Sequence, residues 1–270
     1  MIVDLYLLLS AVISAFASVA VAGELGLSAL LIFVGMTVGL FIGFIVLHLV
    51  LCFVAGMFTD LSEPCTRRRP IYRAVAAISA AGVLRIMRVR VHISGKELPR
   101  GRFLLVSNHL SAFDPIVCID KLRACEIAFI SKPENFKIPI AGKFIHNCNY
   151  LPIDRDNARN AMRTINAAAD LMKNDICSVG VYPEGTRSRT GELQEFHDGV
   201  FRSAAKAKVP IAVVTVRGTE NISRNFPLKA TDVYLHIAEV IEHSEYCGLN
   251  YHELGKAVRD IMLDSLAQMQ

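Results

Sequence analysis

The distribution of apolar positions divides the chain into two parts. Two long stretches without Asp, Glu, Lys or Arg come first, Leu5 to Ala22 and Leu27 to Phe58. Because roughly 20 apolar residues span the hydrocarbon core of a bilayer as a helix, each stretch predicts a membrane helix. At 1.5 Å per residue, the second helix would measure roughly 48 Å against about 30 Å of hydrocarbon, so it must tilt, kink or extend past the membrane.

Beyond these stretches, short apolar runs alternate with segments of helical periodicity. Runs that predict strands lie at 103–107, 126–131, 177–182, 211–216 and 233–241, with a shorter apolar run at 150–153. Helices are predicted at 71–90, 115–121, 138–146, 157–173, 199–206 and 251–268. Strands that alternate with helices are typical of an α/β domain, with a largely parallel sheet flanked by helices. Ligands of such sheets bind where the strands end and the loops begin.

Charge follows the same division. Residues 1–66 contain no Lys or Arg, whereas residues 67–270 carry all 29 basic residues and 21 of the 25 acids, a formal net charge of +8. We therefore expect a membrane anchor over residues 1–66, made of two apolar helices, and one domain over residues 67–270. A domain of that length buries a core of its own.

The orientation of the anchor follows from Arg67-Arg68-Arg69, directly after the second apolar stretch. Positive charge at the end of a span marks the cytoplasmic side, which predicts two spans and a cytoplasmic domain. A helical hairpin within one leaflet is the alternative. A cleaved signal peptide is disfavoured, because Asp4 stands where a basic segment would precede the apolar stretch. The basic helix at 71–90 either lies against an anionic surface or is an ordinary first helix of the domain.

The seven cysteines are scattered and include no C-x-x-C pair. An odd, scattered set argues against a disulfide framework and against a zinc site, and it fits a reducing compartment. We therefore expect no metal ion and no other cofactor.

The first candidate chemical group follows the strand predicted at 103–107. The stretch Ser107 to Pro115, SNHLSAFDP, contains His109 and, five residues later, Asp114. A carboxylate that binds one nitrogen of an imidazole fixes its tautomer and makes the other nitrogen a better general base. A tight turn would bring Asp114 back onto the ring of His109. Alternatively, Asp114 only caps the next helix and His109 is an incidental turn residue.

Two more strand ends carry polar groups. One has Lys132 and Lys137 on the loop before LPIDRD, which includes Arg155; the other is YPEGTRSR, with Glu184, Gly185, Thr186 and Arg187. An Arg guanidinium fits a phosphate or carboxylate, and a Gly permits close backbone approach. Each Arg on its own is more often part of a surface ion pair. No phosphate-binding G-x-x-x-x-G-K-[ST] loop and no G-x-S-x-G elbow is present, which disfavours nucleotide hydrolysis and serine-esterase chemistry.

Together these stretches resemble the glycerolipid acyltransferase family. NHLSAFD matches its N-H-x(4)-D motif and YPEGTRS its [FY]-P-E-G-T-R-S motif; LPIDRD and KVPIAVVTVRGTEN are similar to its other two blocks, in family order. The resemblance covers roughly residues 91–241 and is strongest to 1-acyl-sn-glycerol-3-phosphate acyltransferases. It implies a glycerolipid acyltransferase-like α/β fold.

The resemblance also implies roles for the residues. His109 would be the base that deprotonates the acceptor hydroxyl, and Asp114 would orient it. Substrate binding would fall to Lys132, Arg155, Glu184, Gly185, Thr186 and Arg187. The acceptor would be lysophosphatidic acid and the donor acyl-CoA or acyl carrier protein, at the surface of the bilayer that holds both lipids. No nucleic-acid partner is expected.

Two departures from the family pattern and four alternative functions remain. Asn149 stands where the family usually has Gly, and Val213 where it usually has Pro, which bears on the shape of the acceptor and acyl-chain sites. The acceptor could instead be another lysophospholipid or an aminolipid, or glycerol 3-phosphate. A catalytically silent lipid-binding protein is the alternative outside enzymes, and the intact His109, Asp114 and Arg187 speak against it.

Overall fold

The computed structural model describes residues 2–23, 26–154 and 157–269. They fall into two compact units, Met1–Asp60 and Leu61–Gln270. The division lies a few residues before the boundary that charge and hydropathy suggest, in the segment that leads to the first helix of the second unit.

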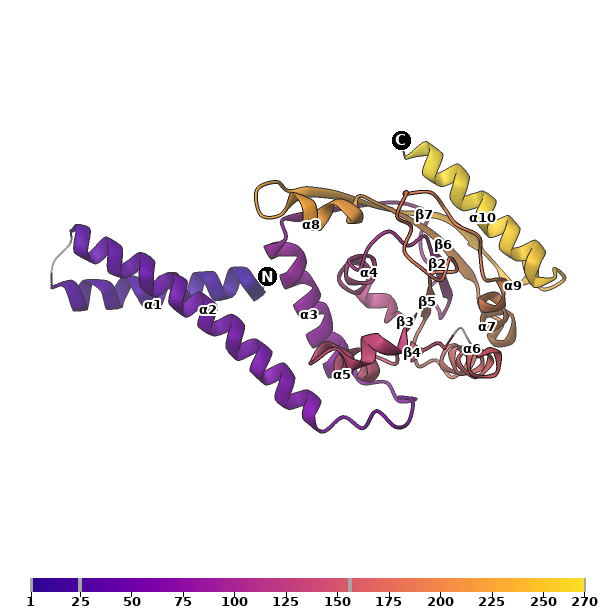
Figure 1. The fold of residues 1–270 in the computed structure, drawn as a ribbon, viewed down its shortest axis with the longest axis horizontal. Helices are drawn as coiled ribbons and strands as arrows, with labels where there is room; N and C mark the ends of the chain where they lie inside the picture. Colours follow the sequence, from indigo (N-terminus) through magenta and orange to yellow (C-terminus); the bar gives the residue numbers. More distant parts are fainter. Residues whose placement is uncertain (1, 24–25, 155–156, 270) are drawn as a thin grey trace. The chain divides into compact units, whose positions relative to one another are not determined.

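The first unit is a pair of apolar helices, α1 (Ile2–Ala22) and α2 (Leu27–Met57), which lie side by side as a hairpin (Figure 1). Both are long and apolar enough to cross a membrane. Ser10, Ser14 and Ser18 are buried along one face of α1, where small side chains let two helices approach closely. The ring of Tyr6 stacks on that of Phe44 with a centroid distance of 5.5 Å.

The second unit contains a seven-stranded sheet in the order β1-β7-β6-β2-β5-β3-β4. Every neighbouring pair is parallel except β6 and β7. A largely parallel α/β sheet is therefore confirmed. The strands are β1 (Val89–Gly95), β2 (Leu104–Ser107), β3 (Ala128–Ser131), β4 (Leu151–Pro152), β5 (Val179–Val181), β6 (Ile211–Arg217) and β7 (Thr231–Ile241).

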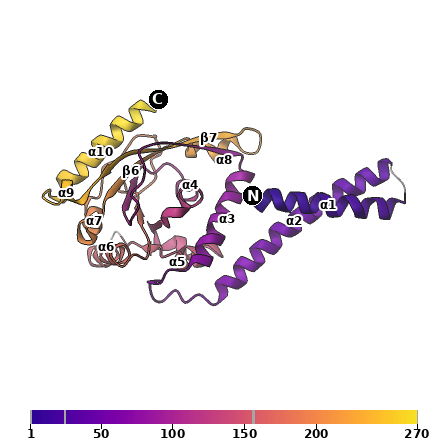
Figure 2. The same cartoon turned by 180° about the vertical axis from the view of Figure 1, so that it is seen from behind.

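Helices cover both faces of this sheet (Figures 1 and 2). One face carries α3 (Pro70–Ile86), α4 (Asp114–Lys121) and α5 (Ala141–Asn147); the other carries α6 (Ala158–Lys173), α7 (Phe201–Ala207) and α10 (Tyr251–Gln268). The remaining helices are short: α8 (Ile222–Asn225), α9 (His243–Tyr246) and 3-10 turns at Arg123–Cys125, Pro133–Lys137, Asp198–Val200 and Thr219–Asn221.

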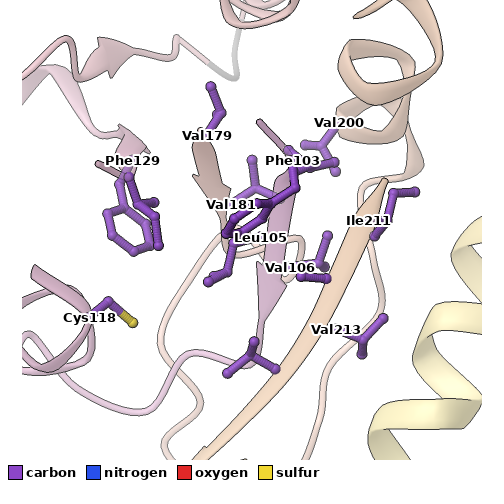
Figure 3. Packing of buried hydrophobic residues seen from close by; sticks show 14 of the residues in the cluster. Phe103, Leu105, Val106, Cys118, Phe129, Val179, Val181, Val200, Ile211 and Val213 are labelled. Atoms are coloured by element: carbon purple, nitrogen blue, oxygen red, sulfur yellow. The ribbon is translucent and has the colours of Figure 1, made fainter. Parts of the chain in front are cut away.

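The core lies between these layers. Leu104, Leu105 and Val106 of β2 are fully buried, and so are Ile211 to Val216 of β6. Figure 3 shows Leu105 and Val106 among residues from β5, β6 and α4. Because parallel strands are buried on both faces, their sequences are continuous apolar runs, which is why sequence analysis located them.

The helix expected at 71–90 ends earlier, and a strand follows it. After Ile86 the chain forms β1, which pairs with β7 at the edge of the sheet. Arg90, His92 and Ser94 alternate with apolar residues there and are exposed. A short edge strand with a polar face has no continuous apolar run, so the sequence pattern did not reveal it.

The segment before α3 is fastened to the end of α5 by Asn149. The side-chain amide of Asn149 donates hydrogen bonds to the carbonyl oxygens of Cys65 (2.6 Å) and Arg67 (3.0 Å), and its oxygen accepts one from Arg73 (2.8 Å). Asn149 has φ +66°, a left-handed conformation that Gly and Asn adopt most readily. The departure from the family's Gly therefore keeps the backbone shape and adds a clamp, which we call the Asn149 clamp.

Candidate active site

Three neighbouring strands of the sheet end side by side. β2 is parallel to both β5 and β6, so the loops that follow Ser107, Val181 and Arg217 leave the same edge. The stretches that sequence analysis selected after β2 and β5 therefore meet, and the start of the loop after β6 joins them. We call this the site edge.

The expected contact between His109 and Asp114 is present. His109 Nδ1 lies 2.7 Å from Asp114 Oδ2. Because an ionised carboxylate only accepts hydrogen bonds, the neutral imidazole in this contact carries its proton on Nδ1 and its free lone pair on Nε2. The side chain of His109 is 19% exposed and that of Asp114 is fully buried. A histidine in this state is suited to act as a general base toward a ligand at the site edge.

Asp114 is held from several sides. Its Oδ2 also accepts the backbone N–H groups of Leu110 and Ser111, each at 2.8 Å, and its Oδ1 accepts the hydroxyl of Thr219. The expectation that Asp114 caps the helix is wrong: α4 begins at Asp114 itself, and the carboxylate binds amides upstream of the helix. These contacts orient the carboxylate toward the imidazole ring.

Asn108 joins the site loop to β6. It is 3% exposed, and its side chain pairs with the backbone of Val216, donating to the oxygen at 2.9 Å and accepting from the nitrogen at 2.8 Å. This pairing continues the β2–β6 ladder one residue beyond the strand. Asn108 and Thr219 are structural members of the site that sequence analysis did not assign, although both lie within the stretches that resemble the family blocks.

Glu184 connects the two loops. Its Oε1 accepts the backbone N–H of His109 at 2.7 Å, and Oε2 accepts that of Gln194 at 3.0 Å. Burial raises the pKa of Glu184, and these two amide hydrogen bonds oppose the rise. The structure thus places Glu184 as a brace for the His109 backbone. Its expected contact with substrate stays a prediction.

The turn after β5 presents the other expected binding groups. Gly185 has φ +72°, which favours glycine, and its N–H closes the turn on the oxygen of Tyr182 at 3.0 Å. Thr186 and Arg187 follow as exposed residues. The N–H of Ser188 donates to the oxygen of His109 at 2.8 Å, which fixes this turn beside the histidine.

The other basic residues lie farther along the sheet or outside the described residues. Lys132 is exposed and follows β3, which is separated from β2 by β5. It lies at the same edge because β3 is parallel to β5. Arg155 falls outside the described residues, so its expected role stays a prediction.

A row of aromatic rings runs inward from His109. Its ring stacks on Tyr182 with a centroid distance of 4.2 Å, Tyr182 stacks on Phe129 at 5.3 Å, and Phe129 packs on Tyr150 at 5.8 Å. Burial raises the pKa of both tyrosines well above the ordinary value. Neither hydroxyl has a hydrogen-bond partner among the described residues. The stack fixes the plane of the imidazole.

Tyr150 also lines a cavity of about 60 Å³ between α3, α4 and α5. Its walls are mainly apolar and include Leu122 and Phe144, with Arg73 at the side of the Asn149 clamp.

Over residues 2–23, 26–154 and 157–269, no group of three or more His, Cys, Asp and Glu residues is placed to hold a metal ion. The described residues of the site can therefore transfer a proton at His109, and the turn beside it carries the exposed guanidinium of Arg187.

Comparison with known proteins agrees with this geometry. Residues 88–217 match the family model described as Acyltransferase. The chain is 25% identical over 182 residues to the 1-acyl-sn-glycerol-3-phosphate acyltransferase of Borreliella burgdorferi, which covers 66% of this chain and 72% of that protein. It is 29% identical over 169 residues to the enzyme of the same name from Salmonella typhimurium, covering 63% and 69%.

A solved structure has the same fold. The crystal structure of the 1-acyl-sn-glycerophosphate acyltransferase PlsC from Thermotoga maritima superposes with a TM-score of 0.62 and 23% sequence identity, over 81% of this chain and 87% of that one. The matched segment, residues 88–217, contains His109, Asp114 and the turn after β5. Residues 88–217 therefore form a domain of the Acyltransferase family, and the chain is an enzyme whose named relatives are 1-acyl-sn-glycerol-3-phosphate acyltransferases.

Proposed function

We propose that the chain transfers a fatty acyl group from acyl-CoA or acyl carrier protein to the sn-2 hydroxyl of lysophosphatidic acid, giving phosphatidic acid for phospholipid biosynthesis. The observation that carries the proposal is the His109–Asp114 pair, in which Nδ1 is bound to a buried carboxylate and Nε2 is left as the base. The names of the relatives support the choice of acceptor.

The proposed reaction begins with proton transfer to His109. His109 Nε2 takes the proton of the acceptor hydroxyl as its oxygen attacks the carbonyl carbon of the donor thioester. The C–O bond forms, the resulting tetrahedral intermediate collapses, and the C–S bond breaks. The proton on His109 then passes to the departing thiolate. No enzyme nucleophile and no cofactor enters this sequence.

The acceptor phosphate would bind at the turn after β5. Arg187 supplies a planar fork that matches phosphate oxygens, and the exposed Thr186 supplies a hydroxyl beside it. Lys132 and Arg155 would add positive charge along the same edge. Glu184 would act by holding the backbone of His109 and, through it, the distance between base and acceptor.

The membrane supplies the substrates. Lysophosphatidic acid and the acyl product partition into a bilayer, and the two apolar helices would anchor the domain there. Acyl-CoA and acyl carrier protein are cytoplasmic, so the catalytic domain would lie on the cytoplasmic face, as the cluster Arg67-Arg68-Arg69 indicates.

The test is an assay of the purified full-length protein in detergent with both donors and a panel of acceptors. We expect the highest kcat/KM with lysophosphatidic acid. His109→Ala should lower kcat about 10²–10⁴-fold, the usual cost of removing a general base.

The matched control is His252→Ala. His252 Nδ1 also lies 2.9 Å from a carboxylate, that of Asp198, but the pair is on the surface and the side chain of His252 is 87% exposed. This variant should keep full activity. A higher kcat/KM with another lysolipid or with glycerol 3-phosphate would show that lysophosphatidic acid is not the preferred acceptor. A fully active, folded His109→Ala protein would overturn the mechanism.

A further inference from the structure

The most exposed apolar side chain of the sheet-containing unit lies on the loop between α8 and β7. Leu228 is 89% exposed, and Phe226 on the same loop is also exposed. At the end of α3, Val83 and Ile86 are exposed as well. Isolated exposed apolar residues are ordinary, whereas a group of them on one surface indicates a binding partner.

Hydrogen bonds hold these two segments together. Arg88, two residues after Ile86, donates from Nη1 to the carbonyl oxygens of Pro227 (3.0 Å) and Leu228 (3.3 Å). The N–H of Thr231 donates to the oxygen of Arg88 at 3.1 Å. Figures 1 and 2 both show the loop after α8 beside the end of α3. We call Val83, Ile86, Phe226 and Leu228 the apolar tip.

The loop that carries Leu228 has a fixed shape. The N–H of Lys229 donates to the oxygen of Asn225 at 2.8 Å, and that of Phe226 donates to the oxygen of Ile222 at 3.1 Å. The side-chain amide of Asn225 donates to Thr231 Oγ1 at 2.9 Å. The two members of the tip on this loop, Phe226 and Leu228, are therefore presented from a braced turn.

The topology places the apolar tip at the site edge. β7 is antiparallel to β6 and begins where β6 ends, with Arg217 opposite Tyr234. β1 is parallel to β7 and begins beside it, with Val89 opposite Thr231. The end of α3 and the start of β7 thus lie on the edge at which Thr219 contacts Asp114.

Basic residues lie close to the members of the tip along the chain. Arg85, Arg88, Arg224 and Lys229 are all exposed and lie within a few residues of its members. Apolar side chains among Lys and Arg are typical of protein surfaces that lie in the headgroup region of an anionic bilayer. The same chain carries two helices long and apolar enough to cross a membrane, so a bilayer is the surface available to the tip.

We propose that the apolar tip inserts into the headgroup region of an anionic bilayer and forms a membrane contact separate from the two apolar helices. The contact lies at the same edge of the sheet as His109, so it would hold this edge of the domain at the lipid surface. It does not depend on which acceptor the enzyme uses.

The absence of tryptophan from the sequence permits a direct test. Leu228→Trp introduces one fluorophore at the tip; the matched control is Leu249→Trp, because Leu249 is 43% exposed and lies beyond the opposite end of β7. The full-length proteins are reconstituted into vesicles of phosphatidylcholine and phosphatidylglycerol, with lipids brominated in the upper acyl chain as quenchers.

We expect Leu228→Trp to emit at shorter wavelength and to be strongly quenched, and Leu249→Trp to emit as in water with little quenching. Quenching should weaken when phosphatidylglycerol is omitted. Equal quenching of the two variants, or none, would overturn the proposal. A blue-shifted Leu228→Trp that brominated lipid does not quench would also overturn it, because another protein copy would then cover the tip. Both variants should retain acyltransferase activity, so this result is separate from that of the substrate assay.

Discussion

At the residue scale, the buried carboxylate of Asp114 determines the state of His109. It accepts four hydrogen bonds, from His109, Leu110, Ser111 and Thr219. A carboxylate bound in this way has little freedom to rotate, so the imidazole that it holds is oriented before substrate arrives. Such preorganisation is what a general base needs for efficient proton transfer.

Thr219→Val tests whether the hydrogen bond from Thr219 to Asp114 Oδ1 contributes to activity. This oxygen is the one that does not contact His109. Val replaces the hydroxyl with a methyl group of similar size, which leaves Asp114 Oδ1 without this donor. An unsatisfied buried acceptor costs about 1–3 kcal/mol. We expect a lower melting temperature and a lower kcat, both restored by Thr219→Ser.

The control for Thr219 is Thr215→Val. Thr215 is also fully buried, and its hydroxyl pairs with Ser265 Oγ at 2.7 Å, away from Asp114. This variant should lose stability and keep kcat. If Thr219→Val had the same profile as Thr215→Val, Thr219 would have no role in positioning the base.

Arg187→Ala tests the phosphate site. Because the proposed contact is with the acceptor alone, KM for lysophosphatidic acid should rise while KM for the donor stays nearly unchanged. Arg187→Lys should restore binding only in part, since a point charge cannot reproduce the planar fork. Arg189→Ala, which removes an exposed Arg two residues along the same turn, is the control. Equal effects on both substrates would assign Arg187 a structural role.

Whether a contact in the site could be predicted from the sequence depended on how far apart its two residues lie along the chain. His109 and Asp114 are five residues apart, so a single turn explains their contact. Thr219 is 105 residues from Asp114, and only the pairing of β2 with β6 brings them together. No local pattern connects residues so far apart, and the support for Asp114 therefore had to come from the structure.

At the element scale, burial explains which strands the sequence predicted. The apolar runs of β2, β5 and β6 are enclosed by helices on both faces, and the sequence located all three. β1 was missed because its outward residues are polar and its partner, β7, lies more than 100 residues later. Among the helices, α10 has the bounds expected from its periodicity, whereas α3 ends at Ile86, four residues before the expected end.

The Asn149 clamp is the element-scale feature open to measurement. Asn149→Ala removes three side-chain hydrogen bonds and places a Cβ-bearing residue without a polar side chain at φ +66°. Asn149→Gly removes the same hydrogen bonds and suits this conformation. We expect both variants to unfold at lower denaturant concentration, with Asn149→Ala less stable than Asn149→Gly by about 1 kcal/mol, the cost of the left-handed conformation. Equal stabilities would mean that the backbone at residue 149 relaxes.

At the scale of the whole molecule, charge and apolar length predict which side of the membrane the domain occupies. Cys65 follows the second apolar helix, but it is buried and its thiol donates to the oxygen of Arg67, so it cannot report sidedness. Cys247 is exposed. Both cysteines lie in the unit that contains the site, so the exposed thiol of Cys247 is the better reporter.

An impermeant maleimide should therefore leave Cys247 unmodified in intact cells and label it after the membrane is permeabilised. The readout is a mass shift of the purified protein, with Cys247→Ser as the control for labelling elsewhere. Modification of Cys247 in intact cells would place the domain outside, away from acyl-CoA and acyl carrier protein, and would contradict the proposed function.

The Asn149 clamp also has a mechanical consequence. Since Asn149 holds the carbonyl groups of Cys65 and Arg67, and Arg68 pairs with Glu126 at 2.8 Å, the chain is secured before α3 begins at Pro70. A pull from the N-terminal side would load these hydrogen bonds first. The force would pass to the end of α5 and to the turn before β3. The first turn of α3 would therefore bear little of the force, and α3, whose end lies at the site edge, would keep its position.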